Sequence, residues 1–289
     1  MPPAPAVPAP PLLTLVIEPR PGWRALDLTE LWAYRELLYF LVWRDIKVRY
    51  KQTVLGAAWA ILQPLATAVV FTLFFGRLAG IGSDGLPYPL FSYAGLLVWT
   101  FFAQGLALSS NSVVGSANLI TKVYFPRLMI PLAAVLSGLL DLAVATPLLA
   151  VMMAYYRVWP GPALATLPLV LLLALLTAAG VGLWLSALNV EYRDVRFVVQ
   201  FLVQLWLFVT PVIYPASTVA PRLERLGVPG WTLGLNPMGG VVEGFRWAML
   251  GHGAAPVHLI AASAAVALVL CVTGALYFRS VEREFADVV

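Results

Sequence analysis

Charge-free apolar stretches alternate with short charged segments along most of this chain. A helix needs about 20 mostly apolar residues to cross a bilayer, and several of these stretches reach that length. The pattern therefore predicts an all-α integral membrane protein with six transmembrane helices. The expected spans are residues 54–76, 89–108, 128–156, 164–188, 197–214 and 256–278, with Ser109–Ser112 as a polar exit from the second span.

Residues 28–52 mix apolar side chains with basic ones and are not predicted to cross the membrane. Arg44, Lys47 and Lys51 recur at the interval of one helical turn, beside an apolar face that carries Trp32. A helix with one basic and one apolar face is typical of the membrane interface. The segment is therefore predicted to be a cytoplasmic interfacial amphipathic helix.

The segment before this helix is rich in proline, with six prolines among the first 11 residues. Proline lacks a backbone donor and favours extended structure. Residues 1–27 are therefore predicted to form a disordered tail, which leaves residues 53–289 as the transmembrane domain.

Residues 215–253, between the fifth and sixth expected spans, hold charged residues among prolines, glycines and tryptophans. Pro237 follows Asn236, and residues 238–250 after it form one amphipathic helix in this reading. We predict two short helices that re-enter the outer leaflet, and a plain extracellular loop is the alternative.

Composition narrows the class of protein. Hydrophobic residues make up 61% and charged residues 11% of the chain, and the mean hydropathy is +0.87. Soluble domains carry about 25% charged residues, so a soluble protein is excluded, and so is a disordered chain. With one cysteine and two histidines, the chain has no internal disulfide and no zinc site built from four cysteines or three histidines.

The distribution of basic residues predicts the orientation. With the N-terminus inside, 13 of the 18 Lys and Arg residues fall on inner segments. Basic residues concentrate on the cytoplasmic side of membrane proteins. We therefore expect both termini in the cytoplasm of a multi-pass inner-membrane protein, and we attribute the basic isoelectric point to this bias and not to nucleic-acid binding.

Motifs for enzymatic chemistry are absent from the sequence. Gly80, Gly82 and Gly85 match a dinucleotide-binding pattern, but they connect two spans and are better explained as a turn. The chain has no phosphate-binding loop, no metalloprotease motif and no serine-hydrolase motif. We predict that it has no catalytic residues and does not hydrolyse ATP itself.

Asp141 is the one carboxylate inside an expected span. Charged groups in membranes are costly and often functional. The alternatives are a direct part in transport and a structural acid capped by Ser137 or by backbone. A proton-coupled carrier needs charged partners at a similar depth, and the sequence places none there.

Four glutamines, Gln63, Gln104, Gln200 and Gln204, lie within three of the expected spans. Gln200 and Gln204 lie on one helix face, with Trp206 and Tyr214 further along. Amides and aromatic rings suit the hydroxyls and apolar faces of sugars, which favours a pore for neutral sugars. The equally good alternative is hydrogen bonding between helices. Gln63 and Gln104 are open to the same two interpretations.

The inner loop between the second and third spans, residues 117–127, is predicted to form a short helix that stops near Pro126. Such a loop is either a rigid protrusion that receives force from a cytoplasmic partner or a plain loop with Lys122 and Arg127 at the membrane edge. The inner loop at residues 189–196 is equally undecided.

Several ordered motifs resemble those of one family, the membrane subunits of ABC-2-type exporters of lipid-linked polysaccharides, such as O-antigen, capsule and teichoic-acid exporters. The resemblance covers residues 35–285. The motifs are residues 44–56, Trp59 with Gln63 and Pro64, residues 93–99, 118–127, 192–194 and 210–215, and Asn236 with Pro237.

The resemblance implies a homodimeric permease that moves a lipid-linked glycan across the inner membrane, with two separate ATP-binding subunits. It places ATP and magnesium on those partners and no cofactor on this chain. The implied sites are ATPase coupling at Asn118, Lys122, Tyr124, Phe125, Pro126 and Arg127; lipid-carrier phosphate at Arg44, Lys47, Arg49 and Lys51; channel lining at Trp59, Gln63, Trp99, Gln200, Gln204, Trp206 and Tyr214; and an outer gate at Asn236, Pro237 and Arg246.

The phosphate-site and exporter interpretations each have an alternative. The four basic residues of the phosphate site would equally attract anionic membrane lipids. An ABC-2 exporter of drugs or small lipids is the alternative function. A secondary carrier would show inverted repeats and mid-membrane ion sites, and a membrane-embedded glycan-transferring enzyme would show clustered acids. Neither pattern is visible.

Overall fold

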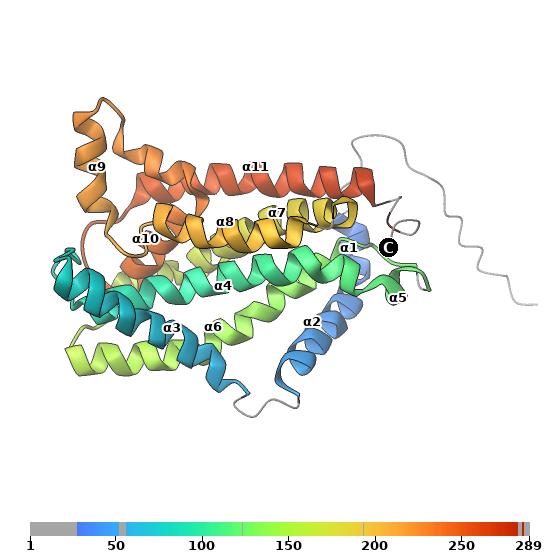
Figure 1. The fold of residues 1–289 in the computed structure, drawn as a ribbon, viewed down its shortest axis with the longest axis horizontal. Coiled ribbons are helices and arrows are strands. Elements are labelled where there is room, and N and C mark those ends of the chain that lie inside the picture. The colour runs from blue at the N-terminus through green and yellow to red at the C-terminus, as the bar shows by residue number, and fades with distance from the viewer. Residues whose placement is uncertain (1–27, 52–55, 123, 193, 283–284, 286–289) are drawn as a thin grey trace, which may run out of the picture.

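The computed structural model describes residues 28–51, 56–122, 124–192, 194–282 and 285. Within these ranges the chain is helical and contains no strand. The long helices run side by side along one axis, with α5 (Ala117–Ile120) and α9 (Ala216–Arg225) at opposite ends (Figure 1). The predicted tail, residues 1–27, lies outside the described residues, as does residue 52 at the end of the predicted interfacial helix.

The helices follow the chain in a simple order. They are α1 (Leu28–Ala33), α2 (Arg35–Tyr50), α3 (Ala58–Phe71), the π-helix η1 (Thr72–Leu78), α4 (Tyr88–Gly115), α5 (Ala117–Ile120), α6 (Met129–Tyr156), the 3-10 helix η2 (Pro162–Thr166), α7 (Leu167–Glu191), α8 (Val195–Val209), α9 (Ala216–Arg225), the 3-10 helix η3 (Gly230–Leu235), α10 (Pro237–Leu250) and α11 (Val257–Val281).

Five helical segments in the described part of the chain are long and apolar enough to cross a membrane. They are Ala58–Leu78, Tyr88–Gly115, Met129–Tyr156, Pro162–Glu191 and Val257–Val281. The helix at the fifth expected span, α8, has 15 residues and is shorter than a span. A multi-pass membrane protein is therefore the architecture, whereas the six-span count stays a prediction.

Two predicted boundaries are wrong. The expected span at residues 197–214 ends at Val209, because Thr210 precedes a proline and adopts an extended conformation. The expected exit at Ser109–Ser112 is part of α4, which continues to Gly115. There the hydroxyls of Ser110 and Ser112 bond to carbonyls three residues earlier, so these residues stay helical.

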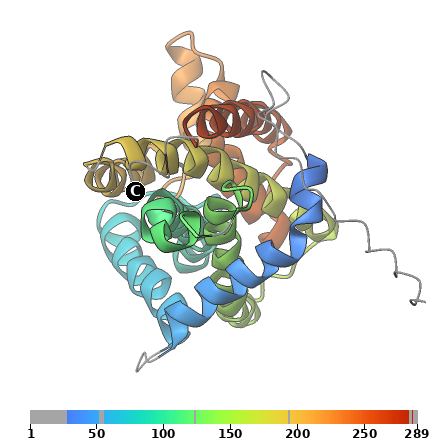
Figure 2. The same ribbon diagram turned by 90° about the vertical axis from the view of Figure 1, so that its right-hand side faces the viewer.

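α4 is the most buried of the long helices. It packs against α3, α6, α7, α8 and α10, and in the view along the bundle it lies among the other helices (Figure 2). Residues 90–99 are all buried, because apolar and small side chains cover all sides of the helix there.

α7 and α11 approach each other closely through glycines. A side chain at Gly180 would collide with the backbone of Cys271, and one at Gly274 with the carbonyl of Gly180. Small residues at a helix interface allow such contact in membranes. Cys271 is a free cysteine within this packed pair of helices.

The predicted single helix at residues 28–52 is two helices, because the chain bends at Tyr34. α2 packs against α6 and slants along it away from the α5 end (Figure 1). Its buried residue, Leu41, shares an apolar cluster with Met129 and Ala133 of α6. Packing against α6 therefore sets its direction, which the amphipathic pattern did not predict.

Candidate functional site

The α5 loop, residues 116–127, connects α4 to α6 at one end of the bundle (Figure 1). Its helix ends at Ile120, earlier than the predicted stop near Pro126. The chain then turns back, so that Phe125 and Pro126 are buried. Phe125 lies in one apolar cluster with Phe278 and Phe285. Burial of Phe125 there requires the chain to leave the helical path, so α5 does not continue to Pro126.

The predicted coupling residues divide into an exposed group and an anchoring group. Asn118, Lys122 and Tyr124 are exposed, and Tyr124 keeps 63% of its surface. Phe125 and Pro126 are buried. The remaining anchor, Arg127, donates a hydrogen bond to the backbone carbonyl of Glu282 after α11. The loop thus presents three side chains to a partner while the others hold it in place; coupling itself stays a prediction.

The four predicted phosphate-binding residues of α2 have different partners. Arg44 pairs with the adjacent Asp45 at 2.9 Å. The Lys47 ammonium lies 5.4 Å from the centre of the Trp43 ring, and Lys47 and Lys51 are exposed. Arg49 is turned into the protein, where it pairs with Asp141. Phosphate binding stays a prediction for all four.

Asp141 has the basic partner that the sequence did not reveal. Arg49 donates to one of its carboxylate oxygens and Tyr50 to the other. Arg49 also donates to the Ser137 hydroxyl at 2.8 Å. The expectation of no charged partner was wrong because Arg49 belongs to a segment that was assigned to the membrane surface. Asp141 is 8% exposed, so it is an ion-paired buried carboxylate.

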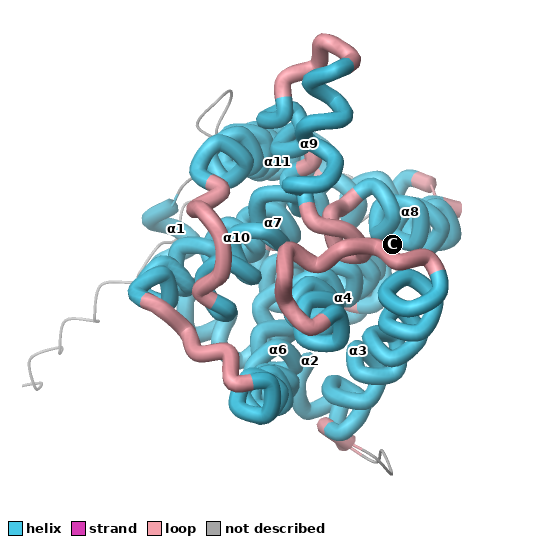
Figure 3. Tube along the Cα trace, turned by 90° about the vertical axis from the view of Figure 1, so that its left-hand side faces the viewer, coloured by secondary structure: helices cyan, strands magenta, loops and turns pink. Residues whose placement is uncertain are grey.

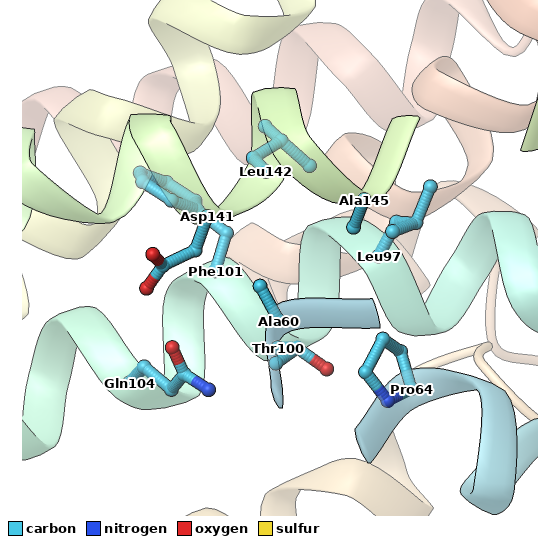
Figure 4. A pocket seen from close by; sticks show the side chains of 9 residues that line it. All are labelled: Ala60, Pro64, Leu97, Thr100, Phe101, Gln104, Asp141, Leu142 and Ala145. Atoms are coloured by element: carbon cyan, nitrogen blue, oxygen red, sulfur yellow. The ribbon is translucent and has the colours of Figure 1, made fainter. Parts of the chain in front are cut away.

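A small pocket opens beside Asp141 between α3, α4 and α6. Asp141 and Gln104 face it from two helices, with Ala60 and Pro64 of α3 opposite (Figure 4). Thr100 adds a hydroxyl to the lining. The Gln104 amide donates to the Gln63 side chain at 3.2 Å. These two glutamines therefore hydrogen-bond between α3 and α4, and channel lining by Gln63 stays a prediction.

The other predicted channel residues occupy mixed environments. Trp59, Gln200 and Gln204 are exposed on α3 and α8. The Tyr214 hydroxyl donates to the carbonyls of Phe208 and Val209 at the end of α8. Trp99 is only 4% exposed and packs against Phe102. Its place in the core corrects the expectation that it lines a channel, because its ring does not reach the surface.

Arg246 of α10 is buried at the end of the bundle opposite the α5 loop. Its guanidinium donates to the carbonyls of Phe91 at 3.1 Å, Pro211 at 2.6 Å and Val212 at 2.5 Å. It also pairs with Glu243 at 3.2 Å. Arg246 therefore satisfies the backbone where α8 has ended and joins it to α4 and α10. A gate role stays a prediction, but the side chain is not at the surface.

Two residues that support Arg246 were missed in the sequence. Glu243 accepts from the Ala216 amide at 3.0 Å and thereby fixes the start of α9. Gly95 leaves room for the guanidinium, with which any side chain there would collide. Glu243 could have been identified from the sequence, because it lies one helical turn before Arg246 in an otherwise apolar helix. Nothing local marks Gly95 as a contact of Arg246.

Asn236 begins α10 and joins it to α8. Its side-chain oxygen accepts from the Met238 amide at 3.1 Å, as a helix N-cap does, and from the Trp206 indole at 2.9 Å. Its amide nitrogen donates to Thr210 at 3.0 Å. Pro237 occupies the first helical position, where its missing N–H costs nothing.

Replacing Asn236 with alanine is expected to lower the free energy of unfolding by about 1–2 kcal/mol, because the cap and two side-chain bonds are lost. Asn236→Asp keeps the accepting oxygen and is expected to lose less. Thermal unfolding midpoints of the detergent-purified variants measure both. An alanine variant as stable as the aspartate variant would contradict the capping role.

The loops at this end cross the bundle in the view along its axis, with α9 projecting beyond them (Figure 3). Gly80 and Gly85 have positive φ angles of 63° and 81°, which confirms the turn expected there. Asp84 in that turn accepts from the Ser217 hydroxyl of α9 at 2.6 Å. The two short helices expected between the last two spans are α9 and α10, separated by η3; their re-entry into the membrane stays a prediction.

The chain matches known proteins over most of its length. Residues 36–250, which include every predicted site residue, match the ABC-2 type transporter family. The chain is 32% identical to the O-antigen export system permease protein RfbA of Myxococcus xanthus over 259 residues, 89% of this chain and 97% of that protein. Two proteins of the same name from Klebsiella pneumoniae are 26% and 25% identical, each across 88% of this chain and 95% of its own length.

Proposed function

This chain belongs to the ABC-2 type transporter family, and on that basis we propose that it is the permease subunit of an ATP-driven exporter of a lipid-linked polysaccharide of the O-antigen type. The single observation that carries this is the 32% identity to an O-antigen export permease along nearly the whole of both chains. The permease is the transmembrane subunit. ATP and magnesium are bound by a separate nucleotide-hydrolysing subunit.

The proposal includes six crossings with both termini in the cytoplasm. α8 is too short to cross alone, but residues 210–213 after it are buried. Non-helical backbone is tolerated at membrane depth when the protein buries it and satisfies its polar groups. Arg246 does this for Pro211 and Val212. The positive-inside bias of the sequence supports the orientation, with the α5 loop inside.

The working unit is a homodimer. Trp59, Gln200 and Gln204 are exposed on α3 and α8 of the single chain. Amides that face lipid have no hydrogen-bonding partner there and are costly. A second copy placed against this face removes the amides from lipid and encloses a path lined by amides and aromatic rings, which suits a polysaccharide.

The cytoplasmic partners dock on the exposed residues of the α5 loop, Asn118, Lys122 and Tyr124. Closure of two ATP-binding subunits then moves the loop and the helices α4 and α6 attached to it, as a rigid-body transition. Arg127 and Phe125 support this transfer, because they join the loop to the end of α11.

The test is to purify the chain with its ATPase and to measure hydrolysis in liposomes with and without lipid-linked O-antigen. Stimulation by the glycan conjugate, and none with the ATPase alone, is the expected result. Failure of the two proteins to co-purify would contradict the coupling. Stimulation by hydrophobic drugs but not by the conjugate would favour the alternative, an ABC-2 exporter of drugs or small lipids.

A further inference from the structure

We propose that Arg49, Tyr50, Ser137 and Asp141, here called the Asp141 cluster, fix the end of α2 against α6 and so position the exposed cations of α2 for the phosphate of the lipid carrier. The mechanical part concerns this chain alone. The part that concerns the carrier rests on the proposed export function.

α2 packs along one face of α6. Met129, Ala133, Ser137 and Asp141 follow one another at intervals of four residues and therefore line a single helix face. Leu41 of α2 packs against the first two of these residues. The first half of the contact is thus apolar, and the second half consists of the Asp141 cluster.

The polar half contains three directed interactions. Both carboxylate oxygens of Asp141 are used, one by Arg49 and one by the Tyr50 hydroxyl. A second nitrogen of Arg49 reaches Ser137 at 2.8 Å. An arginine held by two acceptors has a defined orientation, in contrast to a flexible surface ion pair.

The length of α6 places this cluster near the edge of the apolar layer. A helix of 28 residues is about 42 Å long, more than the roughly 30 Å of hydrocarbon. The last 20 residues of α6, which suffice to cross, begin at Ser137. With residues 137–156 as the crossing segment, the ion pair lies near the boundary at the α5 end, where a charge costs less than at the bilayer centre.

This arrangement assigns different tasks to the four basic residues of α2. Arg49 is engaged by Asp141, and Arg44 by its neighbour Asp45. For Lys47 and Lys51, both exposed, the described part of the chain contains no ion pair. They are the cations that remain for a phosphate group, and Arg49 acts as a positioning residue that holds the end of α2, which carries them, against α6.

The first experiment follows the mobility of α2 without substrate. In a Cys271→Ala background, Val48→Cys on the exposed side of α2 carries a spin label, and the full chain is placed in nanodiscs of phosphatidylethanolamine and phosphatidylglycerol. Asp141→Asn and Arg49→Gln are each expected to cause loss of the immobilised component of the spectrum. The double variant Arg49→Asp with Asp141→Arg is expected to restore it, and Tyr50→Phe is expected to give a partial loss.

Arg44→Gln is the matched control, because it removes an arginine of the same helix whose partner in the described part of the chain, Asp45, also belongs to α2. Its spectrum is expected to equal that of the parent. Unchanged spectra in both single variants would overturn the positioning role. If one single variant fails to fold, the charge-swapped variant and Tyr50→Phe still test the positioning role of the Asp141 cluster.

The second experiment measures ATPase stimulation in the complete transporter. Asp141→Asn is expected to raise the concentration of lipid-linked glycan that gives half-maximal stimulation, with the maximal rate retained. A mobilised label with an unchanged half-maximal concentration would overturn the link to the carrier. If the parent complex itself shows no stimulation, the proposed function fails, while the label result on α2 still stands.

Discussion

Arg246→Met is expected to lower the free energy of unfolding by about 3–5 kcal/mol, as is typical when one partner of a buried charged pair is removed. Methionine fills similar space but donates no hydrogen bond. The carbonyls of Phe91, Pro211 and Val212 would lose a donor, and the Glu243 carboxylate would lose its counter-charge. Equilibrium unfolding of the purified permease in mixed micelles measures the change.

The control for this prediction is Arg225→Met, at the exposed end of α9. Surface changes away from such networks stay within about 0.5 kcal/mol. Equal effects of the two substitutions would contradict the role assigned to Arg246. Introducing Glu243→Gln into the Arg246→Met variant is expected to recover part of the loss, because the uncompensated carboxylate is then removed.

Tyr124→Ala is expected to weaken binding of the ATPase subunit by about 30-fold, which corresponds to the roughly 2 kcal/mol typical of an aromatic hot spot. Tyr124 is 63% exposed on the α5 loop, while its neighbour Phe125 is buried, so the change removes contact surface without disturbing the core. Titration of the purified permease with its ATPase measures the affinity, and the thermal midpoint of the permease is expected to stay unchanged.

Tyr155→Ala serves as the matched control, since Tyr155 is 79% exposed at the opposite end of α6. Its substitution is expected to leave ATPase affinity unaltered. If the Tyr124 variant bound as tightly as the parent, the α5 loop would return to the plain-loop interpretation. Loss of binding by both variants would point to a general defect of assembly and would also contradict the assignment.

The two ends of the bundle are stabilised by different chemistry. At the α9 end, hydrogen bonds of Arg246, Glu243 and Asn236 hold together the place where α8 stops and α10 begins. At the α5 end, Phe125 and Phe285 bury apolar surface beside α11. We expect the first end to resist local opening and the second to move as one body with α4 and α6.

For the candidate sites, the sequence predicted which segments are involved but not which side chains are exposed. Charge and proline placement marked the α5 loop and the basic residues of α2 as candidate segments, and the resemblance to the exporter family implied their roles. Which of these residues are exposed was not predictable, because the burial of Phe125 depends on Phe278 and Phe285, which come from a distant part of the chain. Likewise Gln63 accepts a hydrogen bond from Gln104, which lies 41 positions further along the chain. The local spacing of residues cannot predict such a pair.

The sequence alone determined that the chain is a helical membrane protein, where most spans lie and which family it belongs to. These properties follow from apolar run length and from motif order, which are local and additive. Only the tertiary structure decided that Arg49 pairs with Asp141, that Trp99 is in the core and that Arg246 completes the backbone after α8. Each of these depends on the direction in which one helix crosses another, and packing between distant segments sets that direction.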